Sequence, residues 1–126
     1  MSLEIIQSVF EDIKECVDLI TTRFIDINSH EDFTNKPEGM TKLDAITMRL
    51  QVVGELIKSV DKKNREFLKN YPQIEWIEIM KLRDIISHHY AEVNALVIFK
   101  ICKDDIPLLN KTVIQILSEI KKQNQQ

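Results

Sequence analysis

Apolar residues recur every three or four positions through most of this 126-residue chain. That spacing places them along one face of a helix, whereas a half-buried strand would show an apolar residue at every second position. The chain also contains only two glycines and three prolines, which is too few turn-forming residues for a sandwich or barrel of many short strands. The sequence therefore predicts an all-α protein made of a few long helices.

The first apolar seam covers residues 3–27 and predicts a helix of about seven turns. Residues 28–40 lose this period and predict a loop, with Phe33 packed back onto the core. Thr41 has the character of a helix N-cap, because an acidic residue follows three positions later. A second helix is therefore expected from Thr41, with an apolar seam that ends at Val60.

The second half of the chain predicts two more helices. Residues 61–73 are polar and basic, and residues 74–87 are apolar nearly all round, which is typical of a central, buried helix. A last helical stretch over residues 93–120 is expected to be broken or kinked near Asp105, because Pro107 and the acidic residues before it favour a helix N-terminus. The sum is an up-and-down bundle of four main helices.

Length and composition set further limits. We expect a single domain over residues 1–126, with a tail that frays from about residue 121. A net charge of −3 excludes a bulk polyanion binder, so that nucleic-acid contacts would need a local patch. Cys16 and Cys102 form no C-x-x-C pair and predict reduced, buried thiols. Neither a leader peptide nor a membrane span is apparent, which predicts a soluble, cytoplasmic protein.

One cluster of residues with side chains suited to chemistry lies in and just after the apolar third helix: Arg83, Asp84, Ser87, His88, His89 and Tyr90. A buried charge such as Arg83 is costly unless it is paired or used. Helical geometry places Arg83 on the face of Ser87 and Tyr90, with His88 about 140° away and about 7.5 Å along the axis. Arg83 and His88 can converge only if the helix ends near His88 or if one of them comes from a second protomer.

These residue types suit RNA cleavage without a metal. Histidine can take the proton of the ribose 2′-hydroxyl or donate a proton to the leaving oxygen at neutral pH. Arginine binds phosphate oxygens in a bidentate manner. Because the reaction uses two proton-transfer groups, a two-fold dimer with two copies of Arg83 and His88 in one cleft would supply both.

Plainer interpretations stay open at this point. The cluster can be a structural ion-pair network at the end of a buried helix. A metal site is disfavoured, because His88 and His89 are adjacent, His30 lies in a predicted loop, and no H-E-x-x-H occurs. Gly54, within the second helix, is expected to permit the close approach of another backbone or of a ligand.

Residues 83–90 match the pattern R-x4-H-x-Y, and here the chain resembles the HepT-like toxins of the HEPN superfamily. Other segments resemble landmarks of that family in the same order, and the likeness covers residues 20–117. These segments are Glu31-Asp32-Phe33, Asp44-Ala45-Ile46, residues 49–55, Ile74-Glu75-Trp76 and residues 105–108.

The resemblance implies a homodimeric HEPN bundle and a metal-independent endoribonuclease toxin, encoded beside a minimal nucleotidyltransferase antitoxin. It implies no cofactor, an RNA substrate, and neither DNA nor a membrane as partner. Arg83 and His88 correspond to the catalytic pair, and Tyr90 to the tyrosine that the antitoxin silences by AMPylation. The supporting residues implied around them are Asp84, Ser87, His89 and Glu55.

Two departures and two alternatives accompany this resemblance. Lys81 stands where relatives often have a small residue and could add RNA affinity, and His89 could compete with His88 for the proton role. The first alternative is a non-catalytic HEPN protein that binds nucleotide or substrate for a nucleotidyltransferase. The second is a structural helical dimer whose site has decayed.

Overall fold

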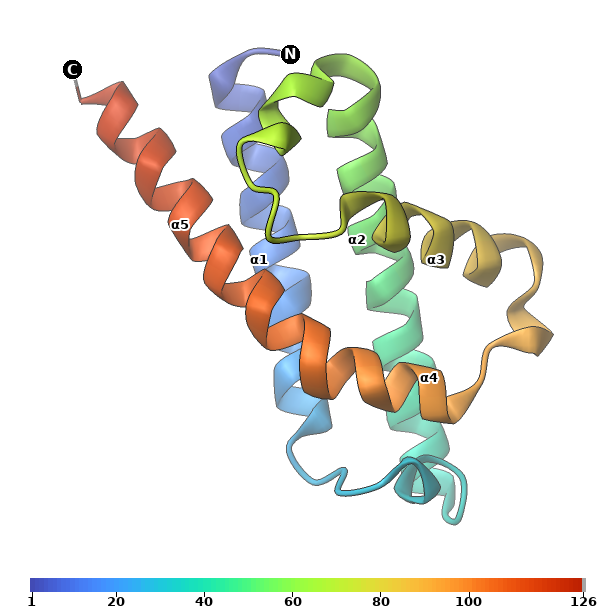
Figure 1. The fold of residues 1–126 in the computed structure, drawn as a ribbon. Coiled ribbons are helices and arrows are strands. Elements are labelled where there is room, and N and C mark those ends of the chain that lie inside the picture. Colours follow the sequence, from blue (N-terminus) through green and yellow to red (C-terminus); the bar gives the residue numbers. More distant parts are fainter. Residues whose placement is uncertain (126) are drawn as a thin grey trace.

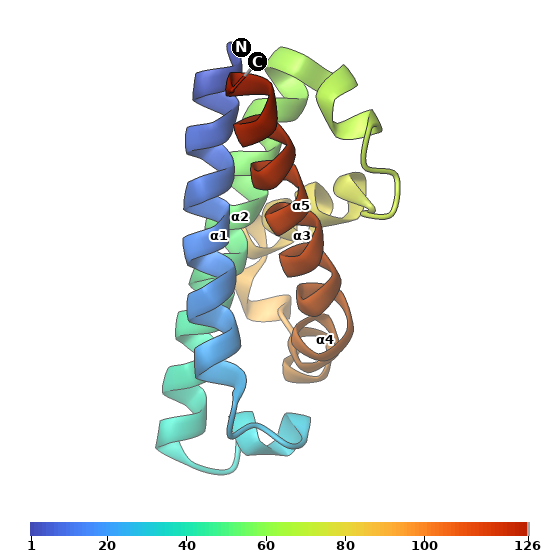
Figure 2. The ribbon, with the colours of Figure 1, turned by 90° about the vertical axis from the view of Figure 1, so that its left-hand side faces the viewer.

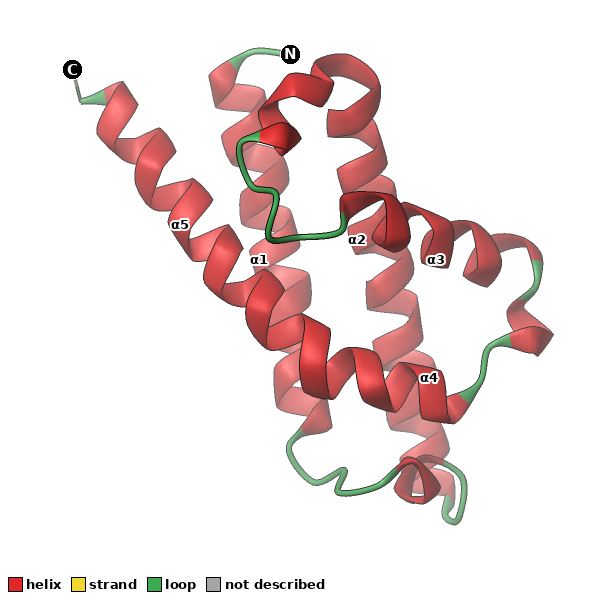
Figure 3. Cartoon of the chain, in the orientation of Figure 1, coloured by secondary structure: helices red, strands yellow, loops and turns green. Residues whose placement is uncertain are grey.

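The structure is a computed structural model that describes residues 1–125, and these residues form helices and connecting loops without a strand (Figures 1 and 3). The all-α prediction is therefore confirmed. The helices are α1 (Leu3–Phe24), α2 (Pro37–Lys69), α3 (Trp76–His88), α4 (Ala95–Lys100) and α5 (Ile106–Asn124), with short segments η1 (His30–Phe33), η2 (Tyr90–Glu92) and η3 (Ile101–Asp105) between them.

The core lies where α1 packs against both α2 and α5. In Figure 2 these three long helices lie side by side, and both chain ends are at the same end of the molecule. The α1 seam is buried as its spacing predicts, with Phe10, Ile13 and Val17 fully inaccessible. A hydrogen bond from Asn124 Nδ2 to Gln7 Oε1, at 3.2 Å, joins the ends of α5 and α1.

The start of α2 differs from the prediction. The helix begins at Pro37 instead of Thr41, whose hydroxyl donates to the Pro37 carbonyl oxygen at 3.1 Å. Proline suits a first helical turn, because its φ is already helical and its missing N–H would have no partner there. Gly39 lies against the preceding segment, and a Cβ at this position would overlap the carbonyl oxygen of Asp32. This close packing leaves Phe33 fully buried, as expected.

The end of α2 also lies further along the chain than the apolar seam indicated. The polar and basic stretch after Val60 stays helical to Lys69, apart from non-helical torsions at Asn64 (φ −155°, ψ 69°). The connection to α3 is tied down by Trp76, whose indole N–H donates to the carbonyl oxygens of Leu68 (3.1 Å) and Tyr71 (3.0 Å).

The prediction that the third helix is central and buried is wrong. Only Trp76 and Ile86 of α3 are buried, whereas Ile77 is 64% exposed and Ile85 is 45% exposed. The physical reason is that α3 crosses α2 and packs on it along one side (Figure 1). Ile85, on another side, lines an open cleft. A helix with apolar residues on all its faces is therefore not buried on all of them here.

The last helical stretch contains a π-helical segment at η3, in the region where the sequence predicted a break or kink. Helical backbone extends from the start of α4 to the end of α5 at Asn124, including residues 121–124, where fraying was predicted. None of the described helices combines the length and the apolar character that crossing a bilayer requires.

Candidate functional site

The motif helix docks on α2 at a glycine. A Cβ at Gly54 would overlap the Cβ of Arg83 and would lie 3.3 Å from the carbonyl oxygen of Ile79. Only a residue without a side chain lets the two helices approach this closely. The expected close approach at Gly54 is therefore the approach of α3, and it places Arg83 directly against α2.

Arg83 is held by two carboxylates. Its Nη2 donates to Glu55 Oε1 at 3.2 Å, and its Nη1 donates to Asp84 Oδ1 at 3.1 Å. The side chain is 23% exposed, and its Nε is buried without a hydrogen-bond partner among the described residues. The hydrogen bonds to Asp84 and then to Glu55 raise the pKa of Arg83 above its ordinary value. The guanidinium is therefore a fixed, permanently charged group with part of its edge open to solvent.

Asp84 connects this arginine to a second cation. Its Oδ1 also accepts a hydrogen bond from Lys58 Nζ at 3.1 Å. The hydrogen bond from Lys58, followed by that from Arg83, lowers the pKa of Asp84 below its ordinary value. The result is a chain of alternating charges, in the order Glu55, Arg83, Asp84 and Lys58, that links α2 to α3 twice.

Two further hydrogen bonds attach the C-terminal end of the motif to α2. Gln51 Nε2 donates to Ser87 Oγ at 3.0 Å, and the Tyr90 hydroxyl donates to Asp44 Oδ1 at 2.9 Å. Tyr90 is 54% exposed. The hydrogen bond to Asp44 is the main cause that raises the pKa of Tyr90, and partial burial adds to it. The phenol is thus oriented but accessible.

The two motif histidines lie at the end of α3. The helix ends at His88, which meets one of the two conditions under which His88 and Arg83 can converge. The His88 side chain is exposed and makes no hydrogen bond to another described residue, and His89 Nδ1 lies 4.0 Å from Glu92 Oε1. The structure therefore joins Arg83 to Asp84 and Glu55 within one chain, and leaves both imidazoles open to solvent.

The described residues contain no group of three or more histidine, cysteine, aspartate or glutamate side chains arranged to hold a metal ion. Cys16 and Cys102 are free and buried. Burial raises the pKa of Cys102 to about 12, which keeps its thiol protonated and unreactive at neutral pH.

Three of the α2 residues at the site were not predicted from the sequence. Asp44, Gln51 and Lys58 are spaced at intervals of seven, so they share the helix face that carries Glu55. All of them contact the motif segment. A polar residue at every seventh position in a helix with an otherwise apolar seam was the signal that could have identified this face.

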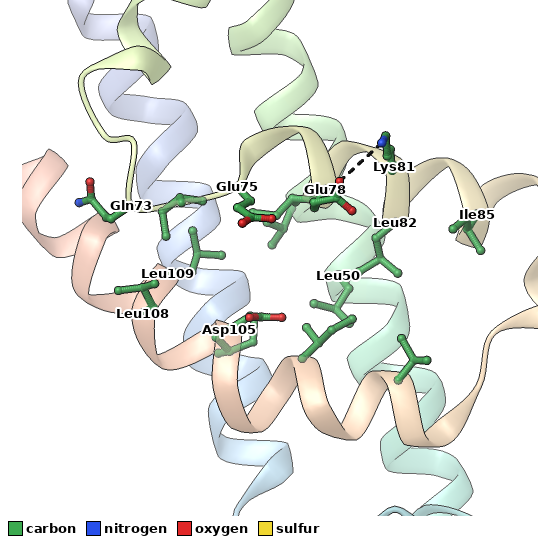
Figure 4. A pocket seen from close by; sticks show the side chains of 16 residues that line it. Leu50, Gln73, Glu75, Glu78, Lys81, Leu82, Ile85, Asp105, Leu108 and Leu109 are labelled. Atoms are coloured by element: carbon green, nitrogen blue, oxygen red, sulfur yellow. Dashed lines mark hydrogen bonds and ion pairs between the residues drawn. The ribbon is translucent and has the colours of Figure 1, made fainter.

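The other side of α3 borders a cleft of about 570 Å³, which α4, η3 and α5 close from the opposite side (Figure 4). Its lining is largely apolar and includes Leu50, Leu82, Ile85 and Leu109. Three carboxylates also line it, with Glu75 and Glu78 on one side and Asp105 across from them (Figure 4), and Glu78 is paired with Lys81 at 3.5 Å. Burial, Asp104 and Glu75, in this order, raise the pKa of Asp105. Arg83, His88 and Tyr90 do not line this cleft.

Comparison with known proteins places the chain in a family. The family model described as "Ribonuclease HepT-like" matches residues 13–116. A "Probable ribonuclease HepT" from Thermococcus cleftensis is 32% identical over 99 residues, which cover 79% of this chain and 84% of that protein. A "Putative RNase" from Caldanaerobacter subterraneus subsp. tengcongensis is 34% identical over 93 residues, covering 74% of this chain and 78% of that protein.

A larger relative matches over one part of its length. It is a "Gamma-glutamylcyclotransferase and putative RNase" from Methanocaldococcus jannaschii, and it is 31% identical over 110 residues. The match covers 87% of this chain but 46% of that protein, so the chain spans about half of this relative. No solved structure matches the chain significantly. Because the family model covers most of the sequence, the chain belongs to the ribonuclease HepT-like family of the HEPN superfamily.

Proposed function

We propose that this chain is a metal-independent endoribonuclease toxin that works as a homodimer, and that a minimal nucleotidyltransferase antitoxin silences it by AMPylation of Tyr90. The observation that carries the proposal is the setting of Arg83. Two carboxylates hold its guanidinium at 3.1 and 3.2 Å, at one end of a motif whose helix ends at His88.

The reaction consistent with these groups is a transesterification. A base removes the proton of the ribose 2′-hydroxyl, the 2′-oxygen bonds to phosphorus, and the bond from phosphorus to the 5′-oxygen breaks. An acid protonates that leaving oxygen, which produces a 2′,3′-cyclic phosphate and a 5′-hydroxyl. His88 suits either proton role, and Arg83 suits the stabilisation of the charge that builds on the phosphorus oxygens.

A second copy of the chain would complete this chemistry. Each chain contributes one His88, whereas the reaction needs both a base and an acid. The structure supports a homodimer through exposed apolar side chains that line one cleft, Ile85 on α3 and Val97 on α4. Exposed apolar side chains that gather in one region are typical of an interaction surface.

Tyr90 is suited to regulation by AMPylation. Its phenol is accessible, and its hydroxyl proton already points to the Asp44 carboxylate. In the transfer, the phenol oxygen would bond to the α-phosphorus of ATP, pyrophosphate would leave, and the phenol would lose its proton. The added nucleotide would bring bulk and negative charge to the end of the motif, where it would repel the RNA backbone.

The test is cleavage of a mixed RNA by purified protein in excess EDTA. Mass spectrometry first establishes that Tyr90 is unmodified. Wild type should cleave and leave 2′,3′-cyclic phosphate ends, and His88→Ala should lose at least about 100-fold in rate, since a general acid or base contributes that much. His89→Ala is the matched control, because it removes the neighbouring exposed imidazole.

Other outcomes would contradict parts of the proposal. Loss of activity in His89→Ala with full activity in His88→Ala would assign the proton transfer to His89. Activity that disappears in EDTA and returns with a divalent ion would contradict the metal-free mechanism. Unmodified wild type that binds a nucleotidyltransferase but never cleaves RNA would favour a non-catalytic binding partner.

A further inference from the structure

Two cations from different helices meet at one carboxylate oxygen. Lys58 Nζ on α2 and Arg83 Nη1 on α3 each lie 3.1 Å from Asp84 Oδ1. Both groups therefore lie within hydrogen-bond distance of the same atom. An anionic oxygen held between an ammonium and a guanidinium is also how proteins bind a phosphate oxygen, which is the chemistry that the proposed substrate presents.

Lys58 is accessible in a way that Arg83 is not. The Lys58 side chain is 50% exposed, whereas that of Arg83 is 23% exposed and donates to two carboxylates. An ammonium has three N–H donors, and the hydrogen bond to Asp84 uses one of them. The remaining donors face solvent beside the motif arginine.

Among the described residues, the other ion-paired lysines do not contact a carboxylate of the motif. Lys42 reaches Asp26, beyond the end of α1, at 3.8 Å. Lys14, Lys69 and Lys81 pair with carboxylates three or four residues away on their own helices. Such pairs on a helix surface contribute little beyond local stabilisation. Lys58 instead reaches across to α3, to the carboxylate that also binds Arg83.

We propose that Lys58 binds a backbone phosphate of the RNA next to the one held at Arg83, and that Asp84 positions both cations. The inference rests on the proposed ribonuclease function and adds a substrate-binding residue to it. Arg83 then acts on the reacting phosphate, while Lys58 contributes to the affinity for the strand. A lysine–phosphate contact is independent of base identity and depends on salt.

The experiment separates binding from chemistry. Lys58→Ala, Lys58→Arg and the control Lys69→Ala are compared with wild type in steady-state cleavage of single-stranded RNA at several salt concentrations. The same three substitutions are placed in His88→Ala protein, and the dissociation constant for an uncleaved, labelled RNA strand is measured. Lys69 is a suitable control because it is an ion-paired lysine on the same helix with a similar charge and exposure.

Lys58→Ala should raise KM and the dissociation constant about tenfold, with kcat within about threefold of wild type. For Lys58→Ala, the slope of log affinity against log salt concentration should fall by about one ionic contact. Lys58→Arg should restore most of the affinity, and Lys69→Ala should change neither constant.

The results that would overturn the inference are distinct from those that would overturn the function. A loss in kcat without a change in KM would show that Lys58 acts only through Asp84 on Arg83, and unchanged constants would show that Lys58 has no role. If wild type does not cleave RNA at all, the proposed function fails, and the binding measurement still decides the role of Lys58.

Discussion

The two sides of α3 contrast in how they are packed. Toward α2 the helix is held closely, with Gly54 against Arg83 and polar side chains joined in hydrogen bonds and ion pairs. Toward α4, η3 and α5 the same helix borders a largely apolar cleft of about 570 Å³, which the carboxylates of Glu75, Glu78 and Asp105 also line. The polar side is held by hydrogen bonds and ion pairs within one chain, whereas the apolar side stays partly open.

The helix still buries apolar side chains, Trp76 and Ile86, and its polar contacts with α2 lie beside them among more exposed residues. The close contact with α2 holds the motif in place, and the open apolar side is the surface that the proposed homodimer would cover. The following predictions test each half of this contrast, beginning with the largest expected effect.

The apolar side is tested by Ile85→Asp. A charge in a covered interface should raise the dissociation constant of the proposed homodimer about 30-fold or more, because central interface residues contribute about 2 kcal/mol or more. Light scattering during size-exclusion chromatography over a range of concentrations measures this shift. Ile114→Asp is the control, since Ile114 is exposed to a similar degree but does not line the cleft. Equal behaviour of the two variants would place the dimer surface elsewhere.

The close contact with α2 is tested by Gly54→Ala. An alanine normally stabilises a helix by about 1 kcal/mol over glycine, but here its Cβ would overlap Arg83. We expect the free energy of unfolding to fall by about 2 kcal/mol, within the range for overpacked sites. Urea denaturation measures it, with Lys62→Ala as the control at an exposed α2 position. A gain in stability would mean that α3 can move away at no cost.

The polar link at the end of the motif is tested by Asp44→Ala. The hydrogen bond to Asp44 raises the pKa of Tyr90 above its ordinary value of 10.0, so its removal should lower the pKa toward that value. Ultraviolet absorbance in an alkaline titration follows the tyrosinate. The Tyr71→Phe variant identifies the other tyrosine, whose pKa burial and Glu119 raise further. An unchanged first titration step would show that the bond does not persist in solution.

The smallest expected effect is on stability at different pH values. It concerns Asp84, which is paired with Lys58 and Arg83, and Asp105, which lines the cleft. The pKa of Asp84 is lowered from 3.8 by Lys58 and Arg83, so its contribution to stability is present above that pH and is lost as pH falls through its folded pKa. The pKa of Asp105 is raised from 3.8 by burial and like charges, so its contribution is present at lower pH and is lost as pH rises through its folded pKa.

Asp84→Asn should therefore weaken the fold slightly at neutral pH, and Asp105→Asn should strengthen it slightly. Thermal unfolding at neutral pH and at acidic pH gives both differences, which should shrink in acid. A carboxyl NMR titration that places both groups on the same side of 3.8 would contradict the contrast.

Much of the fold could be predicted, because the three- and four-residue spacing of apolar residues in α1 and α5 marks the residues that are buried. The environment of α3 could not, because isoleucines such as Ile77 and Ile85 are apolar whether they face a core or a cleft. The start of α2 was missed because the contact of Gly39 with the backbone at Asp32 is tertiary, and only the fold reveals it. Pro37 was a local signal for that start.

The candidate site was predictable in part for a similar reason. The motif identified Arg83, Asp84 and Tyr90 on one segment of the chain. Their partners on α2, such as Lys58 and Asp44, depend on how α3 crosses that helix, and helix crossing is not recorded in any short pattern. Gly54 indicated in the sequence a close approach to the second helix, and the structure shows that Arg83 of α3 is what approaches.

The single tryptophan gives the molecule a built-in optical reporter. Trp76 is the first residue of α3, and its buried indole donates to two carbonyl oxygens at the end of α2 and in the loop that follows. Solvation of this indole would shift its emission to longer wavelength, so fluorescence reports the anchoring of the motif helix at its base. Recorded beside circular dichroism, it would reveal whether α3 detaches before the remaining helices unfold.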